Sequence, residues 1–205
     1  MTGSPETLTA VVNLSMEGAG TAAGKAMTMS RSITFRRERW RQESTVSGES
    51  PVIEGLDGKV PYHMAGGHQV RGNENEVPLA RAVVYHHPVG FLLACFSGNP
   101  QLSNSRVEEG QPAVDLTVDQ RVYSLYLDSK TKLPAKIVSK VGGTVYETSF
   151  GQYQKVHGYT LPYHIVEKVD NQPMIDWTIS RQFPGPDVPG LTVPKDLASA
   201  AQQRP

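Results

Sequence analysis

Residues 121–183 alternate between apolar and polar side chains with a period of two, the pattern of β-strands that bury one face. In the first of these strands Tyr123, Leu125 and Leu127 share one face, and Ser124 and Tyr126 share the other. The connections are too short for the crossover that a parallel pair requires, so neighbouring strands are antiparallel. The predicted strands are 121–128, 133–141, 144–156, 159–169 and 173–183. Such a meander exposes an apolar face that the rest of the chain has to cover.

Turn residues set the ends of the predicted strands. Gly142-Gly143 allows the positive φ angles of a two-residue hairpin, and Asp57-Gly58 favours a type I′ turn. The Asp128 side chain is placed to accept the backbone N–H two residues later. Gly151 predicts a bulge or a bend within the strand 144–156.

The remaining residues predict more of the same sheet and one helical block. Helical spacing of apolar residues begins at Val77; Pro78 suits a first helical turn, and Pro88 forces a break before a second apolar segment. Further strands are expected at 8–17, 26–36, 40–47, 52–56, 60–64, 105–109 and 112–119, with a polar loop at 65–76. Roughly ten or eleven antiparallel strands with one apolar face each cannot lie flat in water. The predicted fold is therefore mainly β (α+β), a single strongly curved antiparallel sheet with a short helical lid at about 77–97.

The domain organisation follows from length and composition. A chain of 205 residues without a linker between two cores suits one domain, which we place at residues 1–183. Residues 184–205 are rich in proline and poor in apolar side chains, so we expect an extended C-terminal arm.

Several segments carry a resemblance to a known family. They are Tyr-Leu-Asp-x-x-Thr-x-Leu-Pro at 126–134, Phe-x-x-Tyr-x-x-Val-x-Gly-Tyr-x-Leu-Pro-Tyr at 150–163 and Ile-Ser-Arg-Gln-Phe at 179–183. They resemble the C-terminal half of LolA-like proteins, the group of periplasmic carriers and outer-membrane lipoprotein-sorting proteins. Asp-Gly-Lys at 57–59 and the arginine of an early strand, here Arg41, are similar too. The resemblance implies a half-open β-barrel in the periplasm that holds acyl chains or another lipophilic group beneath its helices.

A candidate cavity follows from the alternation and the helical block. Its expected lining residues are Val83, Phe91, Leu92, Leu125, Leu127, Leu161, Tyr163, Ile165, Ile175, Trp177 and Ile179. Binding would be hydrophobic transfer, worth roughly 25 cal/mol per Å² of apolar area. The expected partner is a lipophilic small molecule, a lipid or the acyl chains of a lipoprotein, with another envelope protein as a further candidate.

Composition and missing motifs argue against other classes of function. Basic and acidic residues total 20 each, so no net field recruits nucleic acid. Cys95 is the single cysteine and no His-x-x-x-His is present, so no metal or cofactor is expected. There is no P-loop, dinucleotide fingerprint or Gly-x-Ser-x-Gly elbow, and we expect no enzyme.

No apolar run is long enough to cross a bilayer. No signal peptide is visible, which leaves a cytoplasmic location open beside the periplasmic one.

Three functions therefore remain open. Binding of a lipophilic ligand or lipoprotein comes first. A non-catalytic protein-interaction or envelope-sensing domain of the same fold comes second, and would have a filled interior. An enzyme would need polar groups converging inside the barrel. The size and lining of the cavity distinguish the three.

Overall fold

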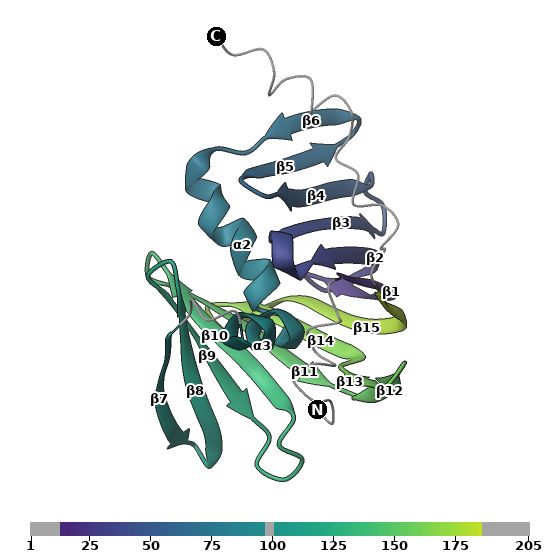
Figure 1. The fold of residues 1–205 in the computed structure, drawn as a ribbon. Coiled ribbons are helices and arrows are strands. Elements are labelled where there is room, and N and C mark those ends of the chain that lie inside the picture. Colours follow the sequence, from purple (N-terminus) through teal and green to yellow (C-terminus); the bar gives the residue numbers. More distant parts are fainter. Residues whose placement is uncertain (1–12, 97–100, 186–205) are drawn as a thin grey trace.

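The computed structural model describes residues 13–96 and 101–185, and in these residues thirteen strands form one antiparallel sheet (Figure 1). One half contains β1 (Asn13–Ala22), β2 (Lys25–Thr34), β3 (Arg39–Val46), β4 (Val52–Asp57), β5 (Val60–Ala65) and β6 (His68–Arg71). The other contains β7 (Gln101–Glu108), β8 (Gln111–Val118), β9 (Arg121–Leu127), β10 (Pro134–Val141), β11 (Thr144–Gly151), β14 (His164–Val169) and β15 (Gln172–Gly185). The halves join where β1 pairs with β15. The short strands β12 (Gln154–Val156) and β13 (Tyr159–Leu161) pair separately.

The mainly-β prediction is confirmed, since the sheet is large, curved and antiparallel and does not close on itself. Its edge strands in the described residues are β6 and β7, and the two helices lie on one face (Figure 1). This is the predicted half-open barrel with a helical lid. The first predicted strand extends into residues 8–12, and the predicted C-terminal arm includes 186–205; both parts lie outside the described residues.

Most turn predictions are confirmed. Gly142 and Gly143 have φ angles of +58° and +100°. The Asp128 carboxylate accepts the N–H of Lys130 at 3.1 Å. The type I′ turn predicted at Asp57-Gly58 is wrong, because of these two residues only Gly58 has a positive φ, +66°. Asp57 pairs with Val60 in the sheet, so the hairpin turns at Gly58 and Lys59, and the Lys59 N–H donates to the Asp57 carbonyl at 2.8 Å.

Two segments differ from the sequence prediction. The strand expected at 144–156 is broken, because Gln152 takes a φ of +50° immediately after Gly151 and turns the chain out of the sheet. The strand expected at 159–169 is divided into β13 and β14. The bend predicted at Gly151 is thus where β11 ends. The loop expected at 65–76 contains the edge strand β6, because Gly66 and Gly67 both adopt positive φ and close a hairpin with β5.

The helical lid consists of α2 (Val77–Tyr85) and α3 (Pro88–Phe96), as predicted. Short 3₁₀ turns, η1 (Phe35–Arg37) and η2 (Glu74–Glu76), precede β3 and α2. With η2 included, the two helices meet at an angle of 95°. The break falls before Pro88, and Gly90 allows the close approach, since a Cβ there would lie 2.0 Å from the Val84 carbonyl oxygen.

Two apolar clusters lie between the lid and the concave face of the sheet. The first lies where β1 and β15 join the two halves of the sheet, and it includes Leu14, Met29, Trp40 and Ile165. The second lies under α3 and includes Phe91, Leu116, Tyr123, Leu125 and Ile137. Both clusters therefore lie on the concave face, as the alternation along each strand predicts.

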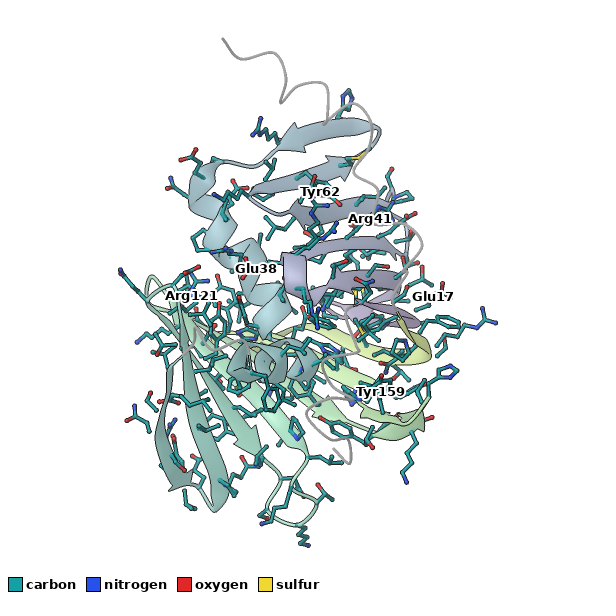
Figure 2. All side chains as sticks on the ribbon, viewed as in Figure 1. Glu17, Glu38, Arg41, Tyr62, Arg121 and Tyr159 are labelled. Carbon is teal, nitrogen blue, oxygen red and sulfur yellow. The ribbon has the colours of Figure 1, made fainter. Side chains whose placement is uncertain are left out.

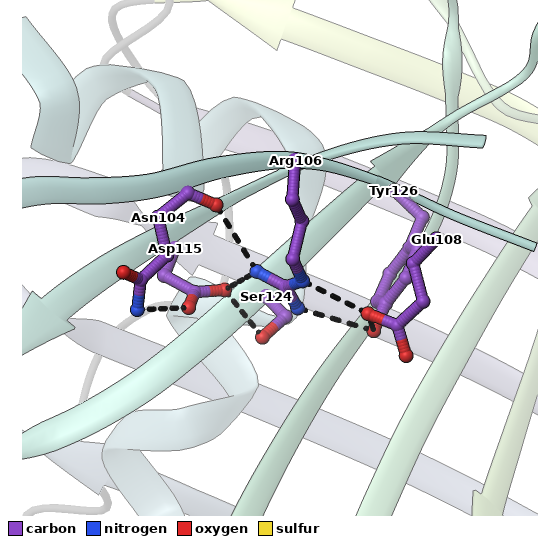
Figure 3. A network of polar contacts seen from close by, with 6 residues as sticks. All are labelled: Asn104, Arg106, Glu108, Asp115, Ser124 and Tyr126. Atoms are coloured by element: carbon purple, nitrogen blue, oxygen red, sulfur yellow. Dashed lines mark hydrogen bonds and ion pairs between the residues drawn. The ribbon is translucent and has the colours of Figure 1, made fainter.

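The opposite, convex face of β7–β9 carries a polar network (Figure 3). Arg106 contacts Asp115 at 2.7 Å and Glu108 at 2.9 Å, and Ser124 donates to Asp115 at 2.7 Å. Burial alone would raise the pKa of Asp115, but its bonds with Arg106, Ser124 and Asn104 hold it below the usual value. The network fastens the edge strand β7 to β8 beside the irregular register between Ser103 and Arg106.

Candidate functional site

A pocket of about 450 Å³ lies between α2 and the concave face of the sheet. This volume is within the range of roughly 300–1,000 Å³ that is usual for small-molecule sites. Its walls are mainly apolar and come from α2, β3, β5, β14 and β15: Trp40, Pro61, Leu79, Ala80, Val83, Ile165, Val169 and Met174. Leu79 and Met174 are more than two-fifths exposed, so they mark the opening to solvent. The lid therefore leaves one part of the apolar interior unfilled.

Helix α2 is fastened to the sheet around this pocket. The Trp40 indole N–H donates to the Ala80 carbonyl at 2.7 Å. Arg121 donates to the Pro78 carbonyl at the first turn of the helix. Arg81 contacts both Glu38 and Asp119 on the far side of α2. These contacts explain why a short helix with few strong helix formers holds its position.

The inner end of the pocket is polar, because the last turn of α2 delivers two adjacent histidines to it. The His86 ring nitrogens contact Thr148 Oγ1 at 2.9 Å and Ser139 Oγ at 2.7 Å. Burial lowers the pKa of His86 to about 4. Burial, reinforced by the positive charge of Arg31, lowers the pKa of His87 to about 3. Both imidazoles are therefore neutral at neutral pH.

A series of charged and polar side chains, joined by hydrogen bonds, crosses the floor of the pocket. Arg31, at an inward position of β2, contacts Glu167 of β14 at 2.6 Å and Gln42 of β3 at 2.7 Å. Gln42 in turn donates to Glu54 at 2.9 Å. The Arg31 guanidinium also lies 5.6 Å from the centre of the Trp177 ring. The floor thus holds a buried cation with a matching carboxylate, and this ion pair links a strand of one half of the sheet to a strand of the other.

The structure places two of the predicted lining residues, Val83 and Ile165, in this pocket. Eight of the others belong to the apolar clusters or pack against them: Phe91, Leu125, Leu127, Leu161, Tyr163, Ile175, Trp177 and Ile179. Leu92 is half-buried on α3. That these residues bind a ligand remains a prediction.

Trp177 is completely buried beneath Arg31 rather than at the pocket surface. Its ring lies over β1, where a Cβ at Gly18 would come within 2.6 Å of the indole nitrogen. The tryptophan in the pocket wall is Trp40. A fluorescence signal from a bound ligand is therefore expected from Trp40.

Arg41, the arginine that matches the family pattern, does not reach the pocket. Trp40 faces the pocket, and the next residue along a strand points to the opposite face. Arg41 contacts Glu43 at 3.0 Å on the convex side (Figure 2). The pocket is lined instead by residues that the sequence did not single out as candidates: Arg31, Trp40, His86 and His87. Arg31 carried a usable signal, because it is a charge at an inward position of an otherwise apolar face, Met27, Met29 and Ile33.

A second cleft of about 410 Å³ lies on the other side of the lid, beside η1 and β8. It is lined by charged groups that are paired with one another, including Arg81, Glu38 and Asp119. Burial and the hydrogen bond to Glu38 raise the pKa of Tyr85, which also faces this cleft. Its lining offers far less continuous apolar surface than the pocket beneath α2.

Within residues 13–96 and 101–185 no group of three or more histidine, cysteine or acidic side chains is arranged to hold a metal ion. No single helix of the described chain is both long and apolar enough to span a membrane. The lid helices together pass that test by length and composition, but they are sharply bent.

No family model matches the chain, and no curated protein matches it. Solved structures do match. A putative outer membrane lipoprotein-sorting protein domain from Vibrio parahaemolyticus superposes with a TM-score of 0.55 at 8% identity, covering 95% of this chain and 92% of that one. A LolA superfamily protein from Nitrosomonas europaea gives 0.51 at 11% identity, with 86% of each chain covered. A DUF1329 family protein from Desulfovibrio piger gives 0.56 at 7% identity, with 90% of each covered.

These structures confirm, at the level of the fold, the resemblance to LolA-like proteins. The chain therefore shares their fold, a half-open barrel made of a curved antiparallel sheet with a helical lid.

Proposed function

We propose that this protein binds a lipophilic ligand, or an acyl chain of a lipoprotein, in the pocket between α2 and the curved sheet. The observation that carries the proposal is the pocket itself, about 450 Å³ of mainly apolar space beneath α2. Transfer of an apolar chain into it is favourable by roughly 25 cal/mol per Å² buried. The exposed Leu79 and Met174 provide an apolar path to the opening.

The proposal extends to the setting of the protein. The likeness to a lipoprotein-sorting domain and a LolA superfamily protein supports a non-catalytic role in the cell envelope, with lipids or lipoproteins as partners. We propose residues 1–183 as the binding domain, with the segment after them as an extension.

Quenching by a brominated fatty acyl chain tests the binding site. Bromine quenches only nearby tryptophan, so the bound chain is expected to quench Trp40, and Trp177→Phe is expected to keep the quenching. Val83→Phe places extra volume in the pocket and is expected to weaken binding at least tenfold. The matched control is Leu93→Phe, which adds a similar ring at the second cleft. Equal affinities of the two folded variants would place the ligand elsewhere, and no quenching of the wild type would refute binding.

A protein-interaction domain is the second candidate. Two apolar clusters pack between the lid and the sheet, and the edge strand β7 exposes Leu102 and Val107, the latter at 74%. An exposed strand edge with apolar side chains can pair with a strand of another protein. Val107→Lys is expected to abolish such pairing without any effect on the quenching of Trp40.

A further inference from the structure

The second cleft, beside η1 and β8, has a wall that is fixed by one buried side chain. Phe35 of η1 is buried, and its ring centre lies 5.5 Å from that of His87. A Cβ at Gly90 would lie 3.2 Å from the Phe35 ring, so the start of α3 packs directly on η1. With Phe35 turned inwards, the next two residues, Arg36 and Arg37, are exposed and line the cleft.

The charged side chains of this cleft do not balance. Its lining holds three arginines and two carboxylates, an excess of one positive charge: Arg36, Arg37, Arg81, Glu38 and Asp119. Arg81 contacts Glu38 at 2.5 Å and also contacts Asp119, so both carboxylates have a cation (Figure 2). Among the described residues Arg37 has no carboxylate partner. The positive charge of η1 is therefore directed to the cleft without a matching anion at Arg37.

The tyrosine of the cleft adds no negative charge. The Tyr85 hydroxyl donates to Glu38, on the carboxylate that Arg81 also contacts. Burial and this hydrogen bond raise the pKa of Tyr85, so its hydroxyl keeps its proton at neutral pH. Since Glu38 is bound by Arg81 and Tyr85 together, the cleft offers no free carboxylate to a cationic ligand there.

The remaining lining is apolar. Val84 and Gly90 are buried at its base, and Leu93 and Ala94 of α3 and Val118 of β8 are half-buried. The cleft thus combines a partly open apolar surface with guanidinium groups at η1. A ligand that uses both parts needs an apolar body and an anionic group.

We propose that the second cleft binds a small organic anion, a compact apolar group that carries one oxyanion such as a phosphate or a carboxylate. The oxyanion lies at the Arg37 guanidinium, whose N–H donors suit the oxygens of either group. The apolar group lies on Leu93 and Ala94 of α3. The cleft volume of about 410 Å³ is within the range of roughly 300–1,000 Å³ that is usual for small molecules.

This site is independent of the proposed function. The second cleft and the pocket beneath α2 have no lining residue in common, because they use different side chains of α2. The cleft takes Arg81, Val84 and Tyr85, and the pocket takes the rest of its α2 lining from other positions. Each site can therefore be tested with the other left intact.

The test is a calorimetric titration of the full chain with phenyl phosphate at neutral pH. Inorganic phosphate and benzyl alcohol serve as the two halves of this probe, and we expect each to bind at least tenfold more weakly than phenyl phosphate. Equal binding of inorganic phosphate would mean that only the charge is recognised and would overturn the proposal. Benzoate is expected to compete with phenyl phosphate, because both carry an oxyanion on the same ring, and a lack of competition would overturn the shared chemistry.

Charge variants test the position of the oxyanion. Arg37→Gln is expected to weaken the binding of phenyl phosphate about tenfold, as the loss of one charge-assisted hydrogen bond predicts. The matched control is Arg71→Gln, which removes the same charge from an exposed residue of β6, and we expect less than a twofold change. Equal losses in the two folded variants would show that only net charge matters and would overturn the site.

Volume variants test the position of the apolar group. Leu93→Phe adds a ring to the cleft and is expected to weaken phenyl phosphate at least tenfold, whereas Val83→Phe is expected to have no effect, the reverse of their order for the brominated acyl chain. In the wild type, phenyl phosphate is expected to shift the methyl resonances of Leu93 and Ala94, a measurement that needs no variant. Unshifted methyl resonances with phenyl phosphate bound would place it elsewhere.

The outcomes separate this inference from the proposed function. Phenyl phosphate is expected to leave the quenching of Trp40 by the brominated chain unchanged, and displacement of that chain would overturn the second site. Absence of quenching with phenyl phosphate still bound would refute the proposed function and leave the anion site standing.

Discussion

The ion pair between Arg31 and Glu167 is expected to be a large single electrostatic contribution to the stability of this fold. Side-chain exposures are 8% for Arg31 and 27% for Glu167, and the two atoms lie 2.6 Å apart. Loss of one partner of a fully buried pair costs about 3–5 kcal/mol, because the other charge stays buried without compensation. Glu167 is partly solvated and Arg31 keeps Gln42, so we expect about 2–3 kcal/mol for Glu167→Gln.

A double-mutant cycle measures the interaction itself. Arg31→Met removes the cation, and in that background Glu167→Gln is expected to cost at least about 1 kcal/mol less than in the wild type. The measurement is urea unfolding followed by circular dichroism, with an unchanged m-value as evidence that the variants remain comparably folded. The matched control is the exposed pair Lys25–Glu49, with exposures of 63% and 50%, for which Lys25→Met is expected to cost less than about 1 kcal/mol. Additive effects of Arg31→Met and Glu167→Gln would refute the reasoning.

Three other predictions concern turns, packing and pH. Replacement of Gly142-Gly143 by two valines is expected to destabilise by about 1–2 kcal/mol per residue, because both sites have positive φ; an unchanged melting temperature would contradict this. Gly20→Ala is expected to cost about 1–3 kcal/mol in urea unfolding, since its Cβ would lie 1.9 Å from a carbonyl oxygen of β15, whereas Gly185→Ala, in open space, is expected to be nearly neutral. Stability is expected to fall as the pH drops from 6.5 towards 5. In the unfolded chain His86 and His87 have the ordinary pKa of 6.5 and take up protons in this range, whereas their pKa values in the folded protein are lowered to about 4 and about 3. Protonation therefore favours the unfolded state. A urea midpoint that is constant over this range would refute the pH prediction.

Local signals succeeded wherever a few neighbouring residues decide the structure. Gly142-Gly143 and Asp128 turn where expected, and Val77–Phe96 is the helical block, which breaks before Pro88 as predicted. The same reasoning failed where a local signal had two solutions. The hairpin at Asp57-Gly58 closes without the two positive φ angles of a type I′ turn, and Gly66-Gly67 closes a hairpin where a polar loop was expected.

The candidate site was less accessible to sequence reasoning. Alternation correctly put Trp177 and Ile165 on the inner face, but the inner face has a filled part and an open part. Which residues border the open part depends on how α2 crosses the sheet, and that is set by distant contacts such as Trp40 with Ala80 and His86 with Thr148. No motif in the sequence marks His86 and His87, yet both are buried at the pocket.

The sequence by itself determined an antiparallel, curved sheet with a short helical cover, because hairpin turns and residue periodicity act over a few residues at a time. Only the tertiary structure decided that β1 pairs with β15, which joins the two halves of the sheet. That pairing brings Arg31 to Glu167, 136 residues apart, and forms the floor of the pocket on which the two histidines converge. No local pattern encodes such contacts, since they arise from the order of all the strands and from the space that their side chains leave unfilled.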